Sequence, residues 1–342
     1  MTMRFGMFVP QGWRLDLVDV APADQWSTML DLARRADAGP WESIWVYDHF
    51  HTTPTPTDEA THEAWTLMAA YAAATQRVRL GQMCTCMAYR NPAYLAKQAA
   101  TVDAISAGRV EMGIGAGWYE HEWRAYGYGF PRAGVRLGML DEGIQIMRQA
   151  WTHGRSTLDG EHFQVDGAIC RPLPLQDDGI PVWLAGGGEK VTLRIAAKHA
   201  RGSAFMDAAN YVGYTNFGGG LEVFRHKSEV LAQHCRDLGS DFDSITRSSN
   251  HNVIVGETQA DVDDQLARLA DLHRRFLLAG DVDKTLEPYR TSATVGTPEQ
   301  VVAALRELYD AGMTYAICYL PGIAHDTRTL DLMEREVIPA LR

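Results

Sequence analysis

The sequence predicts an α/β protein that folds as a (β/α)8 TIM barrel with insertions, as a single domain over residues 1–342. The first observation is that short apolar runs, which are typical of buried strands, alternate with segments of helical periodicity through the chain. The second is the length of 342 residues, which such barrels use as one domain once insertions are counted. Because a helix between two strands favours parallel pairing, eight such units favour a closed barrel over a doubly wound sheet.

The first four units lie in the first half of the chain. Strands are expected at residues 4–9, 42–47, 78–85 and 109–114, and helices at residues 24–38, 63–75, 93–105 and 136–151. Asn91 followed by Pro92 is a start signal for the third helix. In the fourth helix, Leu140, Ile144 and Met147 recur at helical intervals, which indicates one apolar face.

The remaining units repeat this pattern with two insertions. Residues 156–175 contain Asp-Gly turn signals and are expected to form a β-hairpin. Residues 207–220 are rich in Gly, Asn and Tyr without periodicity, so we expect a lid loop that is mobile without ligand. Strands are expected at residues 181–185, 203–206, 245–255 and 315–320, and helices at residues 189–199, 221–238, 259–278, 299–311 and 327–341.

The composition is that of a globular protein with an acidic surface. The chain has 32 basic and 43 acidic residues and a net charge of −11, which disfavours nucleic acid or an anionic membrane as the main partner. No apolar run approaches the ~20 residues of a membrane span, and no signal peptide is recognisable, so a cytoplasmic location is expected. The five cysteines are scattered and odd in number, which favours reduced thiols over disulfides.

Candidate binding residues follow the strands, because barrels of this kind bind ligands at the carboxyl ends of their strands. The fourth strand ends in Gly-Ile-Gly-Ala-Gly, where Gly115 and Gly117 leave bare backbone for a flat or phosphorylated ligand. Trp118 could stack on a planar ring, or could only cover the barrel rim. After the fifth strand, the run from Gly186 to Gly188 opens a predicted helix whose free N–H groups would hold a phosphate. Both glycine runs could instead serve packing alone.

His49, directly after the second strand, is the first candidate for proton transfer. A histidine gains or loses a proton near neutral pH, and Asp48 beside it could fix its tautomer or contact a cofactor. Neighbouring strand residues point to opposite faces, so only one of the two need line the mouth, and both could be surface residues. Glu122 is the second candidate for acid or base, whereas Glu120 is at least as well explained as a charge at a helix start.

An ordered set of segments resembles the bacterial luciferase-like flavin and deazaflavin oxidoreductases. The set includes SIWVYDHF, GIGAGWYEHEW, PVWLAGGGEK and VGTPEQVV, and the resemblance covers roughly residues 3–202 and 294–320. It implies a luciferase-like barrel that binds FMN or the deazaflavin coenzyme F420 in its mouth. The Asp-His-Phe segment and the Gly-Gly-Gly-Glu segment are similar to the F420-dependent branch, which favours the deazaflavin.

The resemblance also implies roles for individual residues. Asp48 and His49 would lie by the deazaflavin ring, and the segment from Gln82 to Thr85 would support its other face. The family often has a cis peptide bond there that does not precede proline, and Met83-Cys84 is the matching bond. The cofactor-binding residues so predicted are Asp48, Met83, Cys84, Thr85, Gly115, Gly117, Trp118, Gly186, Gly187, Gly188 and Glu189, with His49 and Glu122 as catalytic candidates.

The chain departs from the F420-dependent sugar-phosphate dehydrogenases of the same superfamily at two places. Those enzymes have an acidic residue where Trp118 stands, and a tryptophan shortly after the Asp-His pair, where this chain has His51-Thr52-Thr53. Glucose 6-phosphate is therefore a poor candidate substrate. The prediction is an F420-dependent oxidoreductase that transfers a hydride between the deazaflavin and a small organic substrate.

Other functions remain open at this stage. An FMN-dependent luciferase-like monooxygenase would use the same barrel. A metal-dependent hydrolase could use His49 and His51, which share one face of a strand, but among the later strand ends only Asp207 offers a further ligand. A non-catalytic protein could keep the pocket without the chemistry. Relatives suggest a homodimer, and no metal is expected.

Overall fold

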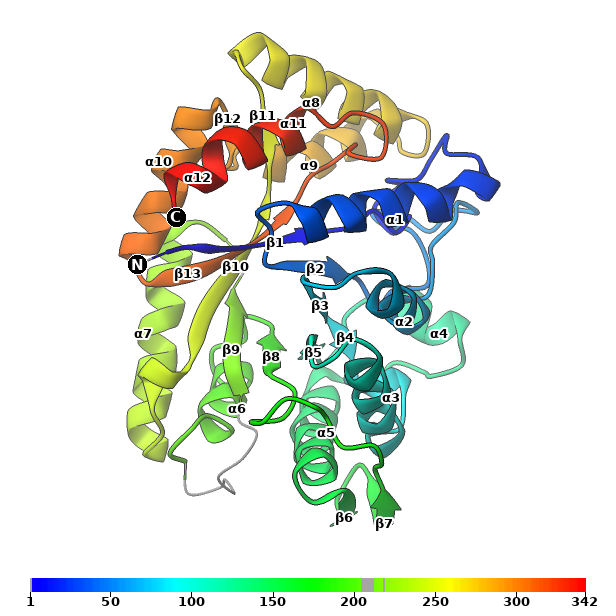
Figure 1. Ribbon diagram of the computed structural model, residues 1–342, viewed down its shortest axis with the longest axis vertical. Coiled ribbons are helices and arrows are strands. Elements are labelled where there is room, and N and C mark those ends of the chain that lie inside the picture. Colours follow the sequence, from blue (N-terminus) through cyan, green and yellow to red (C-terminus); the bar gives the residue numbers. More distant parts are fainter. Residues whose placement is uncertain (1, 204–211, 218) are drawn as a thin grey trace.

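The chain folds around a closed parallel barrel. The computed structural model describes residues 2–203, 212–217 and 219–342, with the strands in the centre and helices around them (Figure 1). The sheet runs in the order β3-β2-β1-β13-β10-β9-β8-β5-β4, and β3 also pairs with β5, which closes the barrel. The predicted (β/α)8 barrel is confirmed. Its strands are β1 (Arg4–Phe8), β2 (Ser43–Val46), β3 (Arg79–Gln82), β4 (Thr85–Cys86), β5 (Val110–Gly115), β8 (Val182–Ala185), β9 (Val212–Phe217), β10 (Thr246–Asn252) and β13 (Met313–Tyr319).

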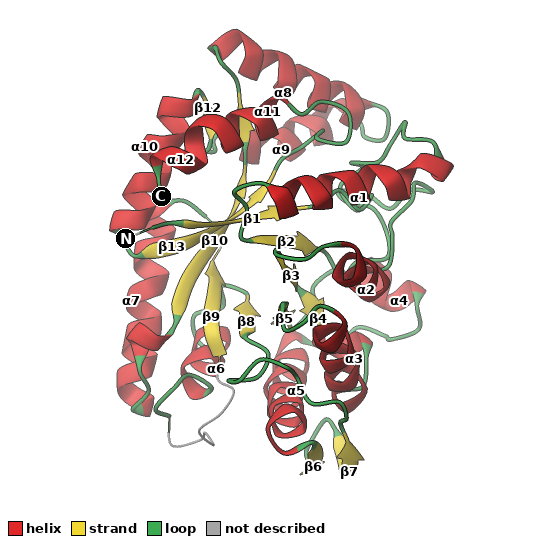
Figure 2. Ribbon diagram, in the orientation of Figure 1, coloured by secondary structure: helices red, strands yellow, loops and turns green. Residues whose placement is uncertain are grey.

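The helices cover the outside of the barrel (Figure 2). Their starts follow the capping signals of the sequence. Asn91 Oδ1 accepts a hydrogen bond from the Ala93 N–H at 2.9 Å, and Pro92 is the first residue of α3. Thr258 and Asp261 form a capping box at α8. The main helices are α1 (Pro22–Ala38), α2 (Ala64–Ala74), α3 (Pro92–Ile105), α5 (Ala133–His153), α6 (Thr192–Lys198), α7 (Leu221–Leu238), α8 (Gln259–Arg274), α9 (Ala279–Arg290) and α10 (Pro298–Asp310).

Three aromatic side chains fill the inside of the barrel. Trp183 packs edge-on against both Trp45 and Tyr315, with ring centroids 4.9 Å apart in each pair, and all three are buried. Glycines on neighbouring strands make room for them. A Cβ atom on Gly81 would lie 2.3 Å from the Trp45 ring, and one on Gly6 would lie 2.4 Å from its Nε1. We call these three rings the aromatic plug, because they close the barrel interior.

The hairpin insertion is confirmed, and the structure has a further insertion, residues 254–296, that was not predicted. β6 (Arg155–Asp159) and β7 (Gln164–Ile169) pair antiparallel within the predicted range. β11 (Ile254–Val255) and β12 (Val295–Gly296) form a ladder outside the barrel sheet, with α8 and α9 between them. The helix predicted over residues 259–278 is therefore too long, because α8 ends at Arg274 and α9 follows as a separate helix.

The sixth barrel strand differs from the prediction. Residues 203–206 were expected as a strand, but Ser203 is not in one and the other three lie outside the described residues. β9 takes the sixth position instead and pairs with β8 and β10. The lid prediction is wrong for residues 212–217, which belong to the barrel wall, while residues 207–211 and 218 lie outside the described part. The buried strand residues Thr215 and Asn216 are polar, so no apolar run marks the strand.

Smaller differences concern helix ends. α6 begins at Thr192, not at residue 189 as predicted, and the helix start suggested for Glu120 is the first residue of a short helix, α4 (Glu120–Ala125). The last predicted helix consists of α11 (Arg328–Leu332), a π-helical turn (Met333–Val337) and α12 (Ile338–Ala340). Across residues 2–203, 212–217 and 219–342, no helix combines the length and the apolar character needed to cross a membrane.

Candidate active site

A cavity of about 400 Å³ opens at the carboxyl ends of the barrel strands, and we call it the mouth cavity. Its wall contains most of the predicted site residues, which come from β2, β3, β5, β8 and the loops that follow them. Thr85, Glu122, Gly188 and Glu189 are predicted site residues that do not line it. The predicted residues that do are Asp48, His49, Met83, Cys84, Gly115, Gly117, Trp118, Gly186 and Gly187.

One part of the wall is formed by two segments that approach closely, the one after β3 and the end of β5. The Met83–Cys84 peptide bond is cis, as the resemblance implied. A Cβ atom on Gly115 would lie 2.7 Å from Cys84 Sγ, so the close approach of these two segments requires glycine. Gly117 has a φ of 76°, which also favours glycine. Thr85 lies behind this wall, where its hydroxyl donates to Gln82 Oε1 at 2.7 Å.

His49 is held in one orientation from two sides. Its Nδ1 lies 2.8 Å from Glu122 Oε2, and its ring stacks on Trp13 with centroids 4.1 Å apart and planes 1° apart. The other Glu122 oxygen accepts the N–H groups of Phe50 at 2.6 Å and His51 at 2.8 Å. Because a carboxylate accepts, His49 Nδ1–H donates, and Nε2 is left as the basic nitrogen. No residue that the structure describes forms a hydrogen bond with Nε2.

Glu122 is ionised and enclosed. Its side chain is fully buried, and burial alone would raise its pKa. The hydrogen bonds from His49, His51 and Phe50 outweigh burial and lower the pKa of Glu122 below its ordinary value. Tyr89 also donates to Glu122 Oε2 at 3.2 Å. With both oxygens occupied and no place in the mouth wall, Glu122 orients His49 and does not itself face a ligand.

Asp48 lines the mouth cavity, but its carboxylate is already bound. Arg90 Nη1 and Nη2 donate to its two oxygens at 2.7 and 2.9 Å, and the Cys86 N–H donates at 2.9 Å. The side chain is buried, so this bidentate pair is shielded from water. Asp48 therefore ties the end of β2 to the segment after β4. This geometry supports an anchoring role more than direct contact with a cofactor.

The glycine turn after β8 is arranged differently from the prediction. Because α6 begins only at Thr192 and is short, the three glycines do not form its first turn. A cation is supplied from α7 instead. Lys227 Nζ donates to the Gly187 carbonyl oxygen and lies 3.5 Å from Glu189 Oε1. Glu189 is turned toward Lys227 and His226 and lies outside the mouth wall, which explains why the predicted cofactor contact is not formed.

The model of the luciferase-like monooxygenase family matches residues 3–315, which is most of the chain. The chain belongs to this family. Luciferase-like relatives match along nearly the whole length. An F420-dependent glucose-6-phosphate dehydrogenase of Nocardia farcinica (strain IFM 10152) is 28% identical over 96% of this chain and 98% of the relative. The enzyme of the same name from Kineococcus radiotolerans is 27% identical over 97% of this chain and 98% of the relative.

Solved structures of low sequence identity share the luciferase-like fold. An F420-dependent secondary alcohol dehydrogenase, in complex with an F420-acetone adduct, has a TM-score of 0.77, 22% identity and full coverage of both chains. A riboflavin lyase with modified FMN has a TM-score of 0.78 and 16% identity, covering 100% of this chain and 92% of its own. At these identities the similarity establishes the fold.

Several residues of this luciferase-like mouth were missed by sequence reasoning. Tyr47 and Ala185 are the last residues of two predicted strands, so their position alone could have suggested them. Trp13 and Arg14 lie in the loop after the first predicted strand, for which the sequence suggested no candidate. Asn216 lies in a strand that was interpreted as a loop. The missed wall residues are Trp13, Arg14, Tyr47, Cys86, Tyr89, Ala116, Leu137, Leu140, Ala185, Thr192, Asn216 and Asn250.

The Cys84 thiol and two histidines at the rim are further groups at the mouth that could carry chemistry. Burial, reinforced by the charge of Asp48, raises the pKa of the Cys84 thiol to about 12, so it is protonated at neutral pH.

His51 Nδ1 lies 2.9 Å from His121 Nδ1 at the exposed rim. Within the described residues, no group of three His, Cys, Asp or Glu side chains could hold a metal ion, and Asp207 lies outside them.

Proposed function

We propose that this protein is an F420-dependent oxidoreductase that transfers a hydride between the deazaflavin and a small organic substrate in the mouth cavity. The observation that carries the proposal is His49, whose Nδ1 is fixed by Glu122 while Nε2 is left unbonded by the described residues. The full-length relatives that are F420-dependent dehydrogenases support the choice of cofactor. Their sugar-phosphate substrate is not part of the proposal, because Trp118 stands where the resemblance implies an acidic residue in sugar-phosphate dehydrogenases.

The mouth cavity fits a flat, phosphorylated cofactor. The segment with the cis Met83–Cys84 bond packs closely on Gly115, and the two together form one wall of the cavity, against which a planar ring could lie. Asn216 and Asn250 place amide groups in the wall, suited to the polar edge of such a ring. The turn at Gly187 with Lys227 beside it provides backbone groups and a cation for a phosphate.

The chain's own residues would position the reactants and move a proton. When bound, the deazaflavin supplies the hydride chemistry. His49 Nε2 would take the proton from a substrate hydroxyl during oxidation, or return it during reduction. Glu122 would hold the Nδ1–H tautomer and stabilise the imidazolium that forms. Trp13 would keep the ring plane fixed through stacking, so that Nε2 reaches the same point in each turnover.

A substitution in the glycine turn tests the cofactor site. A Cβ atom on Gly187 would lie 3.0 Å from Lys227 Nζ, so Gly187→Asp would pair with this lysine and place a negative charge where we expect the phosphate. We expect F420 affinity to fall by at least ~100-fold, the order of a lost charged contact plus repulsion, with the fold intact. Fluorescence titration of the apoprotein with F420 and, separately, with FMN measures this.

The matched control is Gly280→Asp in α9, where an added Cβ atom meets nothing within 4 Å. It adds the same charge and should leave F420 affinity unchanged. Tighter binding of FMN than of F420 would transfer the proposal to an FMN-dependent monooxygenase. Tight F420 binding without turnover over a broad panel of alcohols and aldehydes would indicate a non-catalytic binding protein. Unchanged affinity in a folded Gly187→Asp protein would remove the turn from the site.

A further inference from the structure

Arg14 follows the barrel strand that lies opposite the glycine turn. Around the barrel the order is β1, β2, β3, β5, β8, β9, β10 and β13, so β1 and β8 are four positions apart in either direction. Arg14 comes after β1 and lines the mouth cavity, and Gly187 comes after β8. The mouth therefore has a cationic group on each of two opposite sides, Arg14 on one and Lys227 beside the glycine turn on the other.

Arg14 has no carboxylate partner among the residues that the structure describes. Its Nη1 donates to Asn252 Oδ1 at 3.1 Å and to the Tyr289 hydroxyl at 3.5 Å, both neutral groups. The guanidinium lies over the Tyr319 ring, 4.3 Å from its centroid, and within 5.4 Å of the rings of Trp13 and Tyr47. Its Nε is buried without a hydrogen bond. Burying a cation whose N–H donors lack acceptors costs free energy unless an anion pairs with it.

Other charges of the mouth wall are compensated within the protein. Asp48 is paired with Arg90, and His49 is bound to Glu122. Arg14 is the exception among the described wall residues. An anion that enters the mouth would therefore meet one charged side chain that is not already paired, and this side chain offers the planar donor geometry that binds carboxylate or phosphate in a bidentate manner.

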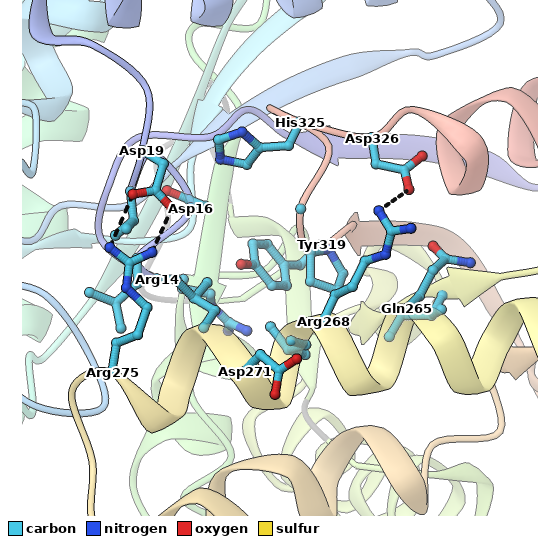
Figure 3. A pocket seen from close by; sticks show the side chains of 17 residues that line it. Arg14, Asp16, Asp19, Gln265, Arg268, Asp271, Arg275, Tyr319, His325 and Asp326 are labelled. Atoms are coloured by element: carbon cyan, nitrogen blue, oxygen red, sulfur yellow. Dashed lines mark hydrogen bonds and ion pairs between the residues drawn. The ribbon is translucent and has the colours of Figure 1, made fainter.

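On the other side of Arg14, no described carboxylate forms a hydrogen bond or an ion pair with the guanidinium. A second cavity of about 320 Å³ lies between the loop after β1, helix α8 and the loop after β13, and Arg14 lines it too (Figure 3). There Arg275 pairs with Asp19 at 2.5 Å and Arg268 pairs with Asp326 at 3.7 Å (Figure 3). Asp16 is near enough for its charge to act on Arg14, but the hydrogen bonds that the structure shows for its carboxylate come from Gln11 N–H at 3.2 Å and Gly12 N–H at 2.6 Å, both to Oδ1.

We infer that Arg14 binds an anionic group of the substrate, a carboxylate or a phosphate, while the reacting carbon lies near His49. This inference rests on the proposed function and adds to it the class of substrate, a small anionic alcohol or carbonyl compound. Lys227 and the glycine turn serve the phosphate of the cofactor, so the two anions bind on opposite sides of the mouth. Trp13 joins the two parts of the substrate site, because its ring contacts both Arg14 and His49.

Calorimetric titration with three matched probes tests the inference. Benzoate and phenyl phosphate carry the two candidate anions, and benzamide is the neutral counterpart of benzoate. Apoprotein and F420-loaded protein should bind at least one anionic probe and bind benzamide more weakly. Arg14→Met should weaken anion binding by ~10- to 100-fold, the size of a lost charged hydrogen bond, and leave benzamide unchanged. Arg14→Lys should retain part of the affinity, because the charge remains and the planar donor pair is lost.

Asn252→Asp provides a second variant that keeps Arg14 in place. It puts a carboxylate where Asn252 Oδ1 lies, 3.1 Å from Nη1, and so supplies the missing counter-charge. Anion binding should be lost while the melting temperature stays equal or rises. Arg275→Met, which removes a cation from the second cavity only, should change none of these affinities. Lys227→Met should weaken F420 binding and leave the anionic probes unaffected.

The outcomes separate this inference from the proposed function. Equal affinity for benzoate and benzamide, no binding of either anion, or anion binding that survives both Arg14→Met and Asn252→Asp would overturn the role of Arg14. None of these results depends on turnover. Loss of the F420 site would instead appear as failure of the cofactor titration, with anion binding to the apoprotein still measurable.

Discussion

Two histidine–carboxylate pairs of similar geometry lie in different surroundings. His49 Nδ1 is 2.8 Å from Glu122, and His199 Nε2 is 2.6 Å from Asp141. The second nitrogen of His199 lies 3.2 Å from Arg148 Nη1, and the ring is buried between α5 and α6. The second nitrogen of His49 belongs to a side chain that lines the mouth and is 13% exposed. A histidine–carboxylate pair is therefore available for chemistry only where its other nitrogen is left without a partner.

The buried surroundings of the second pair fix the charges of its two members. Burial lowers the pKa of His199, and the opposing effect of Asp141 does not restore it. Burial would raise the pKa of Asp141, but hydrogen bonds from His199 and Lys198 lower it. A neutral His199 thus accepts from Arg148 and donates to an ionised Asp141. This pair joins two helices and has no proton to exchange with a ligand.

The largest expected difference between the pairs is in turnover. If His49 moves a proton in the transition state, His49→Ala should lower kcat by ~10²–10⁴-fold and leave F420 affinity within a few-fold. His199→Ala should leave kcat nearly unchanged and lower the melting temperature, because Arg148 and Asp141 lose a buried partner. Single-turnover hydride transfer at saturating cofactor measures the first effect. A folded His49→Ala protein with normal turnover would remove the catalytic role.

A smaller effect is expected from the carboxylates. In Glu122→Gln, the amide NH2 would face His49 Nδ1, so Nδ1 would accept and Nε2 would carry the proton. The kcat/KM for alcohol oxidation, which needs an unprotonated Nε2, should fall by roughly 10- to 1,000-fold, and that for carbonyl reduction should fall by the same factor because both directions share one transition state. Asp141→Asn should change neither direction. A pH–rate profile that matches wild type in shape and height would contradict the role of Glu122 in setting the tautomer.

The smallest expected effect is in the pH dependence of stability. The pKa of His199 is lowered in the folded state, so between this value and the unfolded value of ~6.5 the unfolded chain binds more protons. The contribution of His199 is therefore complete above pH ~6.5 and is lost as the pH falls. His251, whose pKa burial lowers to about 4, acts in the same direction.

Urea unfolding of wild type and His199→Gln between pH 7.5 and 5 measures this contribution. Wild type should lose stability more steeply as the pH falls, and the difference in unfolding free energy between the two proteins should shrink. A constant difference between the curves would contradict a depressed pKa for His199.

The sequence predicted those parts of the fold that are marked by apolar runs. β2 and β5 are buried along their whole length and were found within a residue or two. β9 was missed because both of its faces carry a buried polar residue: Asn216, which lines the mouth and donates to Ser248 Oγ at 3.1 Å, and its neighbour Thr215 on the opposite face. Hydrophobic periodicity cannot find a strand whose buried face is polar.

Site residues that stand directly after a predicted strand were found from the sequence. Those that depend on contacts between distant segments were missed. His49 and Gly187 stand directly after predicted strands, so barrel topology placed them in the mouth. Lys227 reaches Gly187 from a helix forty residues later in the chain, and nothing local to it indicates this contact. Arg14 is one of many arginines in the sequence. Its lack of a carboxylate partner appears only when the chain is folded.

The aromatic plug has a consequence for how such a barrel can diversify. Trp45 occupies the space above Gly81 and Gly6, so neither glycine accepts a side chain while the tryptophan is present. The barrel interior is thus filled by residues that depend on one another, and a substitution in any of them disturbs the rest. Trp118 at the rim of the mouth is exposed and lies outside this interlocked group. Replacing an exposed rim residue such as Trp118 can therefore change which substrate fits while the aromatic plug stays intact.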